Sequence, residues 1–226
     1  MIKGQKIISL IPLRGGSKSI PYKNIKPIAG HPLCYFVLKA AARSKYIDEV
    51  YVSTEDQKIK KAVEELGLGV KIIDRPMELA GDKSTTESVM LHFAEKVPNF
   101  DIINLIQATT PFTSSEDLDI AIEMFAEQKL DSLLTGVLHK KFFWTPFGIP
   151  LNYDYKKRPM RQDFEGVVHE NGAFYLTKKE ILLKDKCRLG GKIGIYVFPE
   201  GAVDIDEPAD WMEAETALLK KFGKTS

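Results

Sequence analysis

Two carboxylates near the C-terminus of this 226-residue chain are spaced for metal binding. Asp204 and Asp206 are separated by one residue, just before a segment that predicts a helix. Alternate side chains of an extended segment face the same side, so the two carboxylates can share a hard divalent cation such as Mg²⁺. For Asp206 alone, a helix N-cap is the simpler interpretation. The pair therefore suits a metal site with oxygen ligands, and the helix N-cap stays open as the alternative.

A basic, glycine-containing segment near the N-terminus has the composition of a phosphate site. Residues 13–24 read LRGGSKSIPYKN. Gly15 and Gly16 allow close approach of the backbone to a ligand, and successive N–H groups can form a nest for an anion. The segment matches neither a P-loop nor the dinucleotide fingerprint. We predict a phosphate site, with a solvated basic turn as the alternative. The side chains that would contact phosphate are Arg14, Ser17, Lys18 and Lys23.

The segments around these residues alternate between strand and helix patterns. Strands are predicted at 6–13, 49–55, 70–76, 100–107 and 132–138, and helices at 32–44, 56–67, 88–97 and 114–128. This alternation predicts an α/β fold with a doubly wound, Rossmann-like, mostly parallel sheet. Ligands of such sheets bind at the carboxyl ends of the strands, which is where the basic segment begins.

The pattern changes at residues 139–166, which are rich in aromatic residues, prolines and bases. Exposure of Phe142, Phe143, Trp144 and Phe147 would be a liability unless another surface covered them, and we expect a partner subunit rather than the chain's own core. Strand patterns return at 171–178 and 192–199, and a closing helix is predicted at 206–222. We predict one domain over 1–226, with a dimerisation and sugar-side segment inserted at about 139–170, and a homodimer.

The overall composition excludes several classes of partner. The net charge is +1, from 32 basic and 31 acidic residues, which gives no support for a nucleic-acid partner. No apolar stretch approaches the length of about 18 residues that a membrane span requires. Cys34 and Cys187 lie far apart and match no metal spacing, so we expect reduced, buried thiols. These features predict a soluble, cytoplasmic protein with no membrane partner.

The basic segment carries a family resemblance. RGGSKSIPYKN, after an apolar strand ending in Pro12, resembles the N-terminal signature of the acylneuraminate cytidylyltransferases, the CMP-sialic acid synthetases. Their loop reads roughly P-x-R-x-x-S-K-x-x-x-x-K-N and wraps the triphosphate of CTP. The resemblance implies nucleotide contacts from Arg14, Gly15, Gly16, Ser17, Lys18, Lys23 and Asn24.

A second stretch, RPMELAGDKSTTES at 75–88, resembles the loop of that family that holds cytosine and ribose. The family pattern is R-P-x-x-L-A-x-D-x-x-S/T-S/T. A pyrimidine is distinguished by hydrogen bonds, which backbone groups and hydroxyls can supply. By itself the segment could simply cap the helix that starts near Ser88, and the two roles are compatible. The implied nucleotide contacts are Arg75, Ser84, Thr85 and Thr86.

The sugar side of the resemblance is less complete. QATTPFT at 107–113 is similar to the family's Q-P-T-S-P-L/F-R, which implies that Gln107 faces the sugar, but Thr113 replaces the final arginine. Whether another base such as Lys83 substitutes for it is open. Arg161 matches an arginine that relatives present to the acid sugar, partly across the subunit interface. His169 stands where many relatives carry a second arginine, which makes it a candidate sugar contact.

The resemblance implies a cytidylyltransferase that transfers CMP from CTP to the anomeric hydroxyl of a nonulosonic, sialic-acid-type sugar and releases pyrophosphate. Its D-x-D pair would hold Mg²⁺ or Mn²⁺, and the catalytic residues would be Arg14, Lys23, Asp204 and Asp206. Other acceptors stay open, namely 3-deoxy-octulosonate, KDN, legionaminate and pseudaminate. A non-catalytic nucleotide-binding homologue is a further alternative, against which the retained Asp204, Asp206 and first loop argue.

Overall fold

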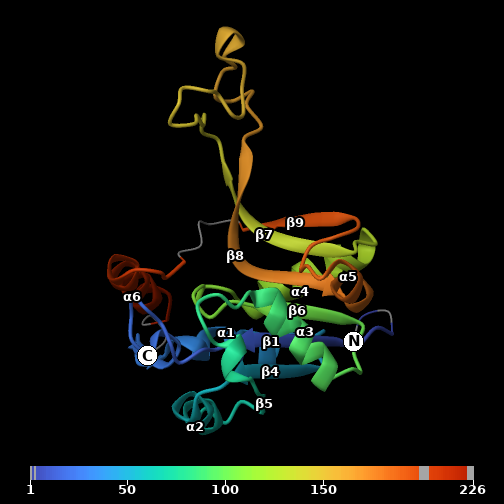
Figure 1. Cartoon of the computed structure of the whole chain (residues 1–226). Helices are drawn as coiled ribbons and strands as arrows, with labels where there is room; N and C mark the ends of the chain where they lie inside the picture. Colours follow the sequence, from blue (N-terminus) through green and yellow to red (C-terminus); the bar gives the residue numbers. More distant parts are fainter. Residues whose placement is uncertain (1, 3, 199–203, 223–226) are drawn as a thin grey trace.

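A seven-stranded sheet forms the centre of the protein, with strand order β5-β4-β1-β6-β8-β7-β9 (Figure 1). The computed structural model describes residue 2, residues 4–198 and residues 204–222. Neighbouring strands pair in parallel except at β8, which runs antiparallel to β6 and β7. The predicted doubly wound, mostly parallel sheet is therefore confirmed. Of the predicted segments, Pro199 and Val203 lie outside the described residues.

The elements follow the predicted order closely. The strands of the large sheet are β1 Ile7–Pro12, β4 Glu49–Thr54, β5 Lys71–Asp74, β6 Ile102–Ile106, β7 Ser132–His139, β8 Val167–Lys178 and β9 Ile193–Val197. A small hairpin joins β2 Pro27–Ile28 to β3 His31–Pro32, and 3-10 turns cover Lys23–Ile25, Met77–Leu79 and Tyr155–Lys157. The helices are α1 Leu33–Arg43, α2 Gln57–Glu65, α3 Thr86–Lys96, α4 Ser115–Glu127, α5 Lys179–Asp185 and α6 Pro208–Phe222.

Helices cover both faces of the sheet, which explains why β1 and β6 are buried along almost their whole length and are mostly apolar. Residues of α1, α2 and α4 form one core with one face of the strands, and residues of α3 and α5 form a second core with the other face. A third cluster joins α6 to α1, where Trp211 and Leu218 pack with Leu33 and Phe36. None of the helices in the described part of the chain is long and apolar enough to cross a membrane.

Local capping fixes where several helices begin. The Asp56 carboxylate accepts from the N–H groups of Lys58 and Ile59 at the start of α2, as its sequence predicts. Ser114 and Asp117 form a capping box at α4, which decides between Ser114 and Ser115 as the cap. Helix α5, which directly follows β8, was not predicted.

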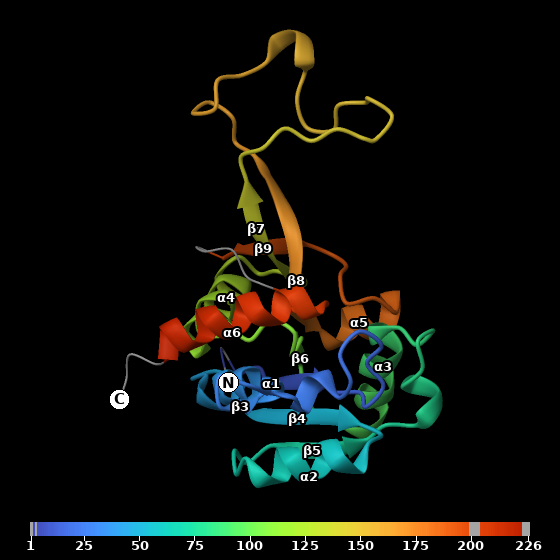
Figure 2. The ribbon, with the colours of Figure 1, turned by 90° about the vertical axis from the view of Figure 1, so that its left-hand side faces the viewer.

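Beyond the sheet, β7 and β8 continue as the paired stem of an arm that projects away from the body (Figures 1 and 2). At its end, Phe142 packs against Tyr153 and Phe164, with ring centroids 4.2 and 4.8 Å apart. Phe147 is 89% exposed, and Trp144 is 44% exposed. The chain's own core therefore does not cover these aromatic residues. The division into one domain with an inserted segment stays a prediction.

Candidate active site

A cleft of about 570 Å³ opens at the carboxyl ends of β1 and β6. Its walls come from segments that lie far apart in the sequence: the first loop, the turn before α3, the loop after β6, part of β8, and the segment before α6. In a parallel sheet these loops meet at one edge, which is why they can share a ligand. The cleft is lined by many of the predicted residues: Arg14, Ser17, Lys18, Lys23, Asn24, Arg75, Ser84, Thr85, Thr86, Gln107, Asp204 and Asp206.

The first loop is tied directly to the C-terminal carboxylate segment. Lys23 Nζ donates to the carbonyl of Ile205 at 2.7 Å and lies 3.2 Å from Asp206 Oδ1. Ser19 Oγ donates to the carbonyl oxygen of Asp206 at 2.5 Å. Ile205 is fully buried, whereas Asp204 and Asp206 on either side of it are exposed and line the cleft. The alternation expected of an extended segment is thus present.

The Asp206 side chain does not cap α6, as the helix N-cap interpretation would require. Instead, the carboxylate of Asp210 accepts from the backbone N–H groups of Asp206 and Glu207, at 2.9 and 2.7 Å. The Asp206 carboxylate is paired with Lys23 across the cleft. Its side chain is therefore available to a ligand rather than committed to the helix terminus.

Asp204 lies in an environment that disfavours its negative charge. Burial raises the pKa of its carboxyl, and the nearby Asp206 and Asp210 carboxylates raise it further, while Thr109 and Lys23 lower it. A carboxylate crowded by another carboxylate gains most when a cation binds between them. Two carboxylates offer only oxygen atoms as ligands, and this is the donor set that binds Mg²⁺ together with substrate phosphates. The chemistry of the pair therefore fits a divalent metal.

The other cations of the first loop are paired across the cleft with Asp82. Arg14 Nη1 lies 3.2 Å and Lys18 Nζ 2.8 Å from its carboxylate oxygens. The hydrogen bond from Lys18 is the main cause that lowers the pKa of Asp82, and Arg14 adds to it. These three side chains are each at least 40% exposed, so the pairs can exchange for a polyanionic ligand at small cost.

Gly15 has a structural role in addition to its predicted contact with the nucleotide, which stays a prediction. Its N–H donates to Glu55 Oε1 at 2.8 Å, so it is not available to a nest. A Cβ at this position would lie 2.6 Å from Asp56 Oδ2, which explains the glycine. The other oxygen of Glu55 accepts two hydrogen bonds from Arg75, at 3.1 and 2.7 Å, in an almost fully buried pair. Gly16 is not among the residues that line the cleft.

The start of α3 combines capping with cleft formation. Thr85 Oγ1 accepts from the N–H of Ser88, which makes Thr85 the N-cap. Ser84 Oγ donates to the carbonyl of Glu78 at 2.7 Å. On the opposite wall, Asn24 Nδ2 donates to the carbonyl of Arg14 at 3.0 Å. The capping interpretation is therefore confirmed, and because Ser84, Thr85 and Thr86 also line the cleft, the predicted nucleotide contacts remain compatible with it.

A second hollow of about 540 Å³ adjoins the cleft and shares Gly172, Tyr175 and Asp204 with it. His169 lines this hollow, with its ring centroid 5.8 Å from that of His139. Asn171 also lines it. Thr135 Oγ1 donates to Asn171 Oδ1, while the buried Nδ2 has no hydrogen-bond partner among the described residues. Such an unpaired donor is costly unless a ligand accepts from it.

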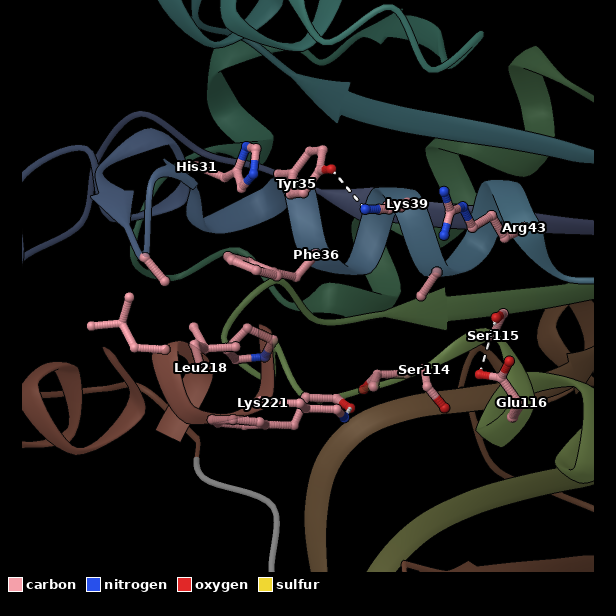
Figure 3. A pocket seen from close by; sticks show the side chains of 16 residues that line it. His31, Tyr35, Phe36, Lys39, Arg43, Ser114, Ser115, Glu116, Leu218 and Lys221 are labelled. Atoms are coloured by element: carbon pink, nitrogen blue, oxygen red, sulfur yellow. Dashed lines mark hydrogen bonds between the residues drawn. The ribbon is translucent and has the colours of Figure 1, made fainter. Parts of the chain in front are cut away.

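Three residues considered for the sugar side lie elsewhere in the single chain. Arg161 is exposed on the arm and lines neither the cleft nor the hollow. Lys83 is exposed and is not part of the cleft wall. Thr113 is buried and faces a different pocket, between α1, the start of α4 and the end of α6. Figure 3 shows this pocket, with Lys39 and Arg43 of α1 opposite Lys221 of α6. Thr113, which stands where the family pattern has an arginine, is therefore not part of the cleft wall.

The sequence missed several residues that line the cleft. Asp82 lies in the 75–88 motif, and Tyr175 lies in the stretch that follows Asn171. Their place in these motifs could have marked both residues as site candidates. Arg188 lies outside every motif, in the loop between α5 and β9. Nothing in its local sequence distinguishes it from a surface arginine.

The fold and the cleft together define an α/β nucleotide-binding protein that opposes cations to a pair of carboxylates. The chain belongs to the cytidylyltransferase family, whose characteristic sequence matches residues 8–211. It is 37% identical over 231 residues to N-acylneuraminate cytidylyltransferase A of Danio rerio, covering 98% of this chain and 53% of the relative. It is 39% identical over 225 residues to N-acylneuraminate cytidylyltransferase of Oncorhynchus mykiss, covering 96% and 51%. The chain thus spans about half the length of these curated relatives.

Solved structures share the fold. A CMP:2-keto-3-deoxy-manno-octonic acid synthetase complexed with CTP superposes with a TM-score of 0.76 at 18% identity, over 96% of this chain and all of the other. A 4-diphosphocytidyl-2C-methyl-D-erythritol synthase from Anaerococcus prevotii has a TM-score of 0.70 at 15% identity, over 96% of this chain and 97% of the other.

Proposed function

We propose that this chain transfers CMP from CTP to the anomeric hydroxyl of a nonulosonic, sialic-acid-type sugar and releases pyrophosphate. The observation that carries the proposal is the single cleft in which the basic first loop meets Asp204 and Asp206. The named relatives support the choice of acceptor, because two of them are N-acylneuraminate cytidylyltransferases more than a third identical to this chain.

The reaction is first a problem of charge, because both substrates are anions. The acid sugar must bring its hydroxyl to the α-phosphorus of CTP, and the bond that breaks releases pyrophosphate. Cations placed in advance stabilise charge that develops on the leaving group. Arg14, Lys18 and Lys23 are suited to this role, and CTP would replace Asp82 and Asp206 as their partners. Positioning and neutralisation account for the catalysis, and no protein nucleophile is needed.

Asp204 and Asp206 are the residues that would hold Mg²⁺ or Mn²⁺. The raised pKa of Asp204 and the all-oxygen donor set fit a hard cation. When bound, such an ion would neutralise phosphate charge and favour loss of the proton from the attacking hydroxyl. The contribution of the chain is to keep the two carboxylates aligned: Ile205 is buried, and its N–H donates to the carbonyl of Thr109 at 2.9 Å.

The hollow beside the cleft is the proposed place of the acid sugar. It adjoins the cleft at Tyr175 and Asp204, so an occupant would face the α-phosphate of a nucleotide bound in the cleft. Asn171 and His169 both line the hollow, and the buried Nδ2 of Asn171 has no hydrogen-bond partner among the described residues. Gln107 lines the cleft on the same side. These groups suit an acceptor that is rich in oxygen atoms.

We also propose that the protein is a homodimer through its arm. Phe147 and other apolar side chains of the arm are exposed, and the arm extends beyond the body of its own chain (Figure 1). A second copy would cover them and would bring Arg161 towards a neighbouring sugar site. This arrangement would explain why Arg161 lies in neither hollow of the single chain.

The test is release of pyrophosphate from CTP and Mg²⁺ with a panel of acceptors: N-acetylneuraminate, KDN, legionaminate, pseudaminate and 3-deoxy-octulosonate. We expect turnover with a nonulosonic acid, dependence on the divalent ion, and little release when ATP, GTP or UTP replaces CTP. Turnover with 3-deoxy-octulosonate alone would move the assignment to that acceptor. Binding of CTP without release for any acceptor would favour a non-catalytic homologue and contradict the proposal.

A further inference from the structure

Arg188 is held in a fixed orientation in the wall of the cleft. Its Nε donates to Glu87 Oε1 of α3 at 2.6 Å, and both side chains are only 21% exposed. Its guanidinium carbon lies 4.9 Å from the centre of the Tyr175 ring of β8. Its carbonyl accepts from Thr177 Oγ1 at 2.6 Å, which fixes the backbone as well. A long side chain with this many contacts is ordered before any ligand arrives.

The position of Arg188 separates it from the other cations of the cleft. Arg14, Lys18 and Lys23 come from the first loop and are paired with Asp82 or Asp206. Arg188 approaches from the loop after α5 and stacks on Tyr175, the residue that borders both the cleft and the adjoining hollow. Among the cations that line the cleft, Arg188 is thus the one that contacts Tyr175, at the junction with the hollow proposed for the acceptor.

An acid sugar needs such a cation, because a carboxylate moved from water into a cleft must be paired. Neither Thr113 nor Lys83 supplies it, since neither lines the cleft or the hollow. Guanidinium groups bind carboxylates through two parallel N–H donors, which gives orientation as well as charge. Glu87 takes the Nε edge of Arg188, so a second carboxylate can still approach Nη1 and Nη2.

We propose that Arg188 binds the carboxylate of the acceptor sugar, with Glu87 and Tyr175 positioning its guanidinium. This inference rests on the proposed function, because it assigns a residue to the acceptor of that reaction. Burial lowers the pKa of Arg188, but the hydrogen bond and charge of Glu87, together with the charges of Tyr175 and Glu170, raise it, and the net shift is upward. The guanidinium is thus charged throughout the pH range in which the enzyme would be assayed.

The experiment compares N-acetylneuraminate with its methyl ester as acceptors for the wild type, Arg188→Gln and Arg188→Lys. We expect Arg188→Gln to raise KM for the acid by about 10- to 100-fold, the cost of losing a hydrogen bond to a charged group, with KM for CTP close to the wild-type value. The ester should already be a poor acceptor for the wild type, and Arg188→Gln should weaken it no further. Arg188→Lys should lie between the two.

Arg43→Gln is the matched control, because Arg43 is exposed on α1 and lines the separate pocket of Figure 3. Equal weakening of acid and ester by Arg188→Gln, or a rise in KM for CTP instead, would overturn the inference. Should Arg188→Gln fail to fold, the wild type still decides: equal KM for acid and ester would contradict a carboxylate contact. Wild-type protein that turns over no acceptor would instead refute the proposed function itself.

Discussion

The two halves of the cleft are built in different ways. The nucleotide half is closed by contacts within the body of the chain: Lys23 with Ile205 and Asp206, and Glu55 with Gly15 and Arg75. The acceptor half is an open hollow at the base of the arm, with an unpaired donor at Asn171.

The comparison shows which parts of the proposed site a single chain can order by itself. The cations proposed to meet CTP are already paired with Asp82 and Asp206, so binding would exchange their partners rather than order free side chains. The hollow proposed for the acceptor lies at the base of the arm, and the arm, with its exposed aromatic residues, points away from its own body (Figure 2). The following predictions test this asymmetry.

The largest effect is expected at Asp206 in the nucleotide half. Asp206→Asn removes one of the two proposed metal ligands and should lower the rate of pyrophosphate release by at least about 10²- to 10³-fold, as loss of a group that stabilises developing charge does. Thermal unfolding should change little, because the side chain is exposed. Glu207→Gln is the control, since the neighbouring acid does not line the cleft. A wild-type rate for Asp206→Asn in magnesium would refute the metal assignment.

The next largest effect is expected at the buried Arg75–Glu55 ion pair of the nucleotide half. Arg75→Met leaves Glu55 as an uncompensated buried charge and should lower the free energy of unfolding by about 3–5 kcal/mol. Urea denaturation measures this change. The double variant Arg75→Met with Glu55→Gln should recover part of the loss, because no charge is then stranded. If the single and double variants are equally unstable, the ion pair is not what braces this loop.

In the acceptor half, Phe147→Ser tests the arm. Burial of a phenylalanine in an interface is worth about 1.5–3 kcal/mol, so dimer dissociation should become roughly tenfold or more easier, as measured by sedimentation. KM for the acceptor should rise, while CTP affinity should not change. Met212→Ser, at a residue 68% exposed on α6, is the control. A monomeric wild-type protein with full activity would show that the acceptor half is complete without a partner.

The smallest effect concerns stability at Asp204. Its folded-state pKa is raised by burial and by Asp206, so the folded protein binds this proton more tightly than the unfolded chain. The free-energy cost of ionising Asp204 in the folded protein is absent below the ordinary carboxyl pKa, near 4. It is fully present once the pH has risen through the raised folded-state pKa. Asp204→Asn should therefore stabilise the metal-free protein at neutral pH, by less than about 1 kcal/mol because the residue is partly solvated. Urea titrations at acid and neutral pH should show the gain only at the higher pH.

The sequence predicted the structure best where functional residues lie in segments with a clear strand or helix pattern. The strands and most helices followed from apolar period and caps, and burial of Ile205 between two exposed aspartates follows from alternation. Cys34 is buried, and burial raises the pKa of its thiol to about 12, in agreement with an inert thiol, whereas Cys187 is only partly buried.

Other features could not be predicted because they depend on long-range contacts. A side chain at position 15 would collide with Asp56. This close approach, and not a phosphate, accounts for the glycine, and it depends on how β4 lies beside β1. Arg188 becomes a cleft residue only because Glu87 of α3 and Tyr175 of β8 converge on it. Neither partner is near it in the sequence, so no local pattern could have marked it.

Strand β8 gives the molecule a mechanical property. Residues Val167–Lys178 form one continuous strand that starts in the stem of the arm and ends between β6 and β7 in the sheet. Gly172 and Tyr175, which border both hollows, lie on this same strand. The stem of the arm and the border between the two hollows are therefore built from the same length of backbone. In the proposed homodimer, a partner that holds the arm would also hold the strand that carries Gly172 and Tyr175.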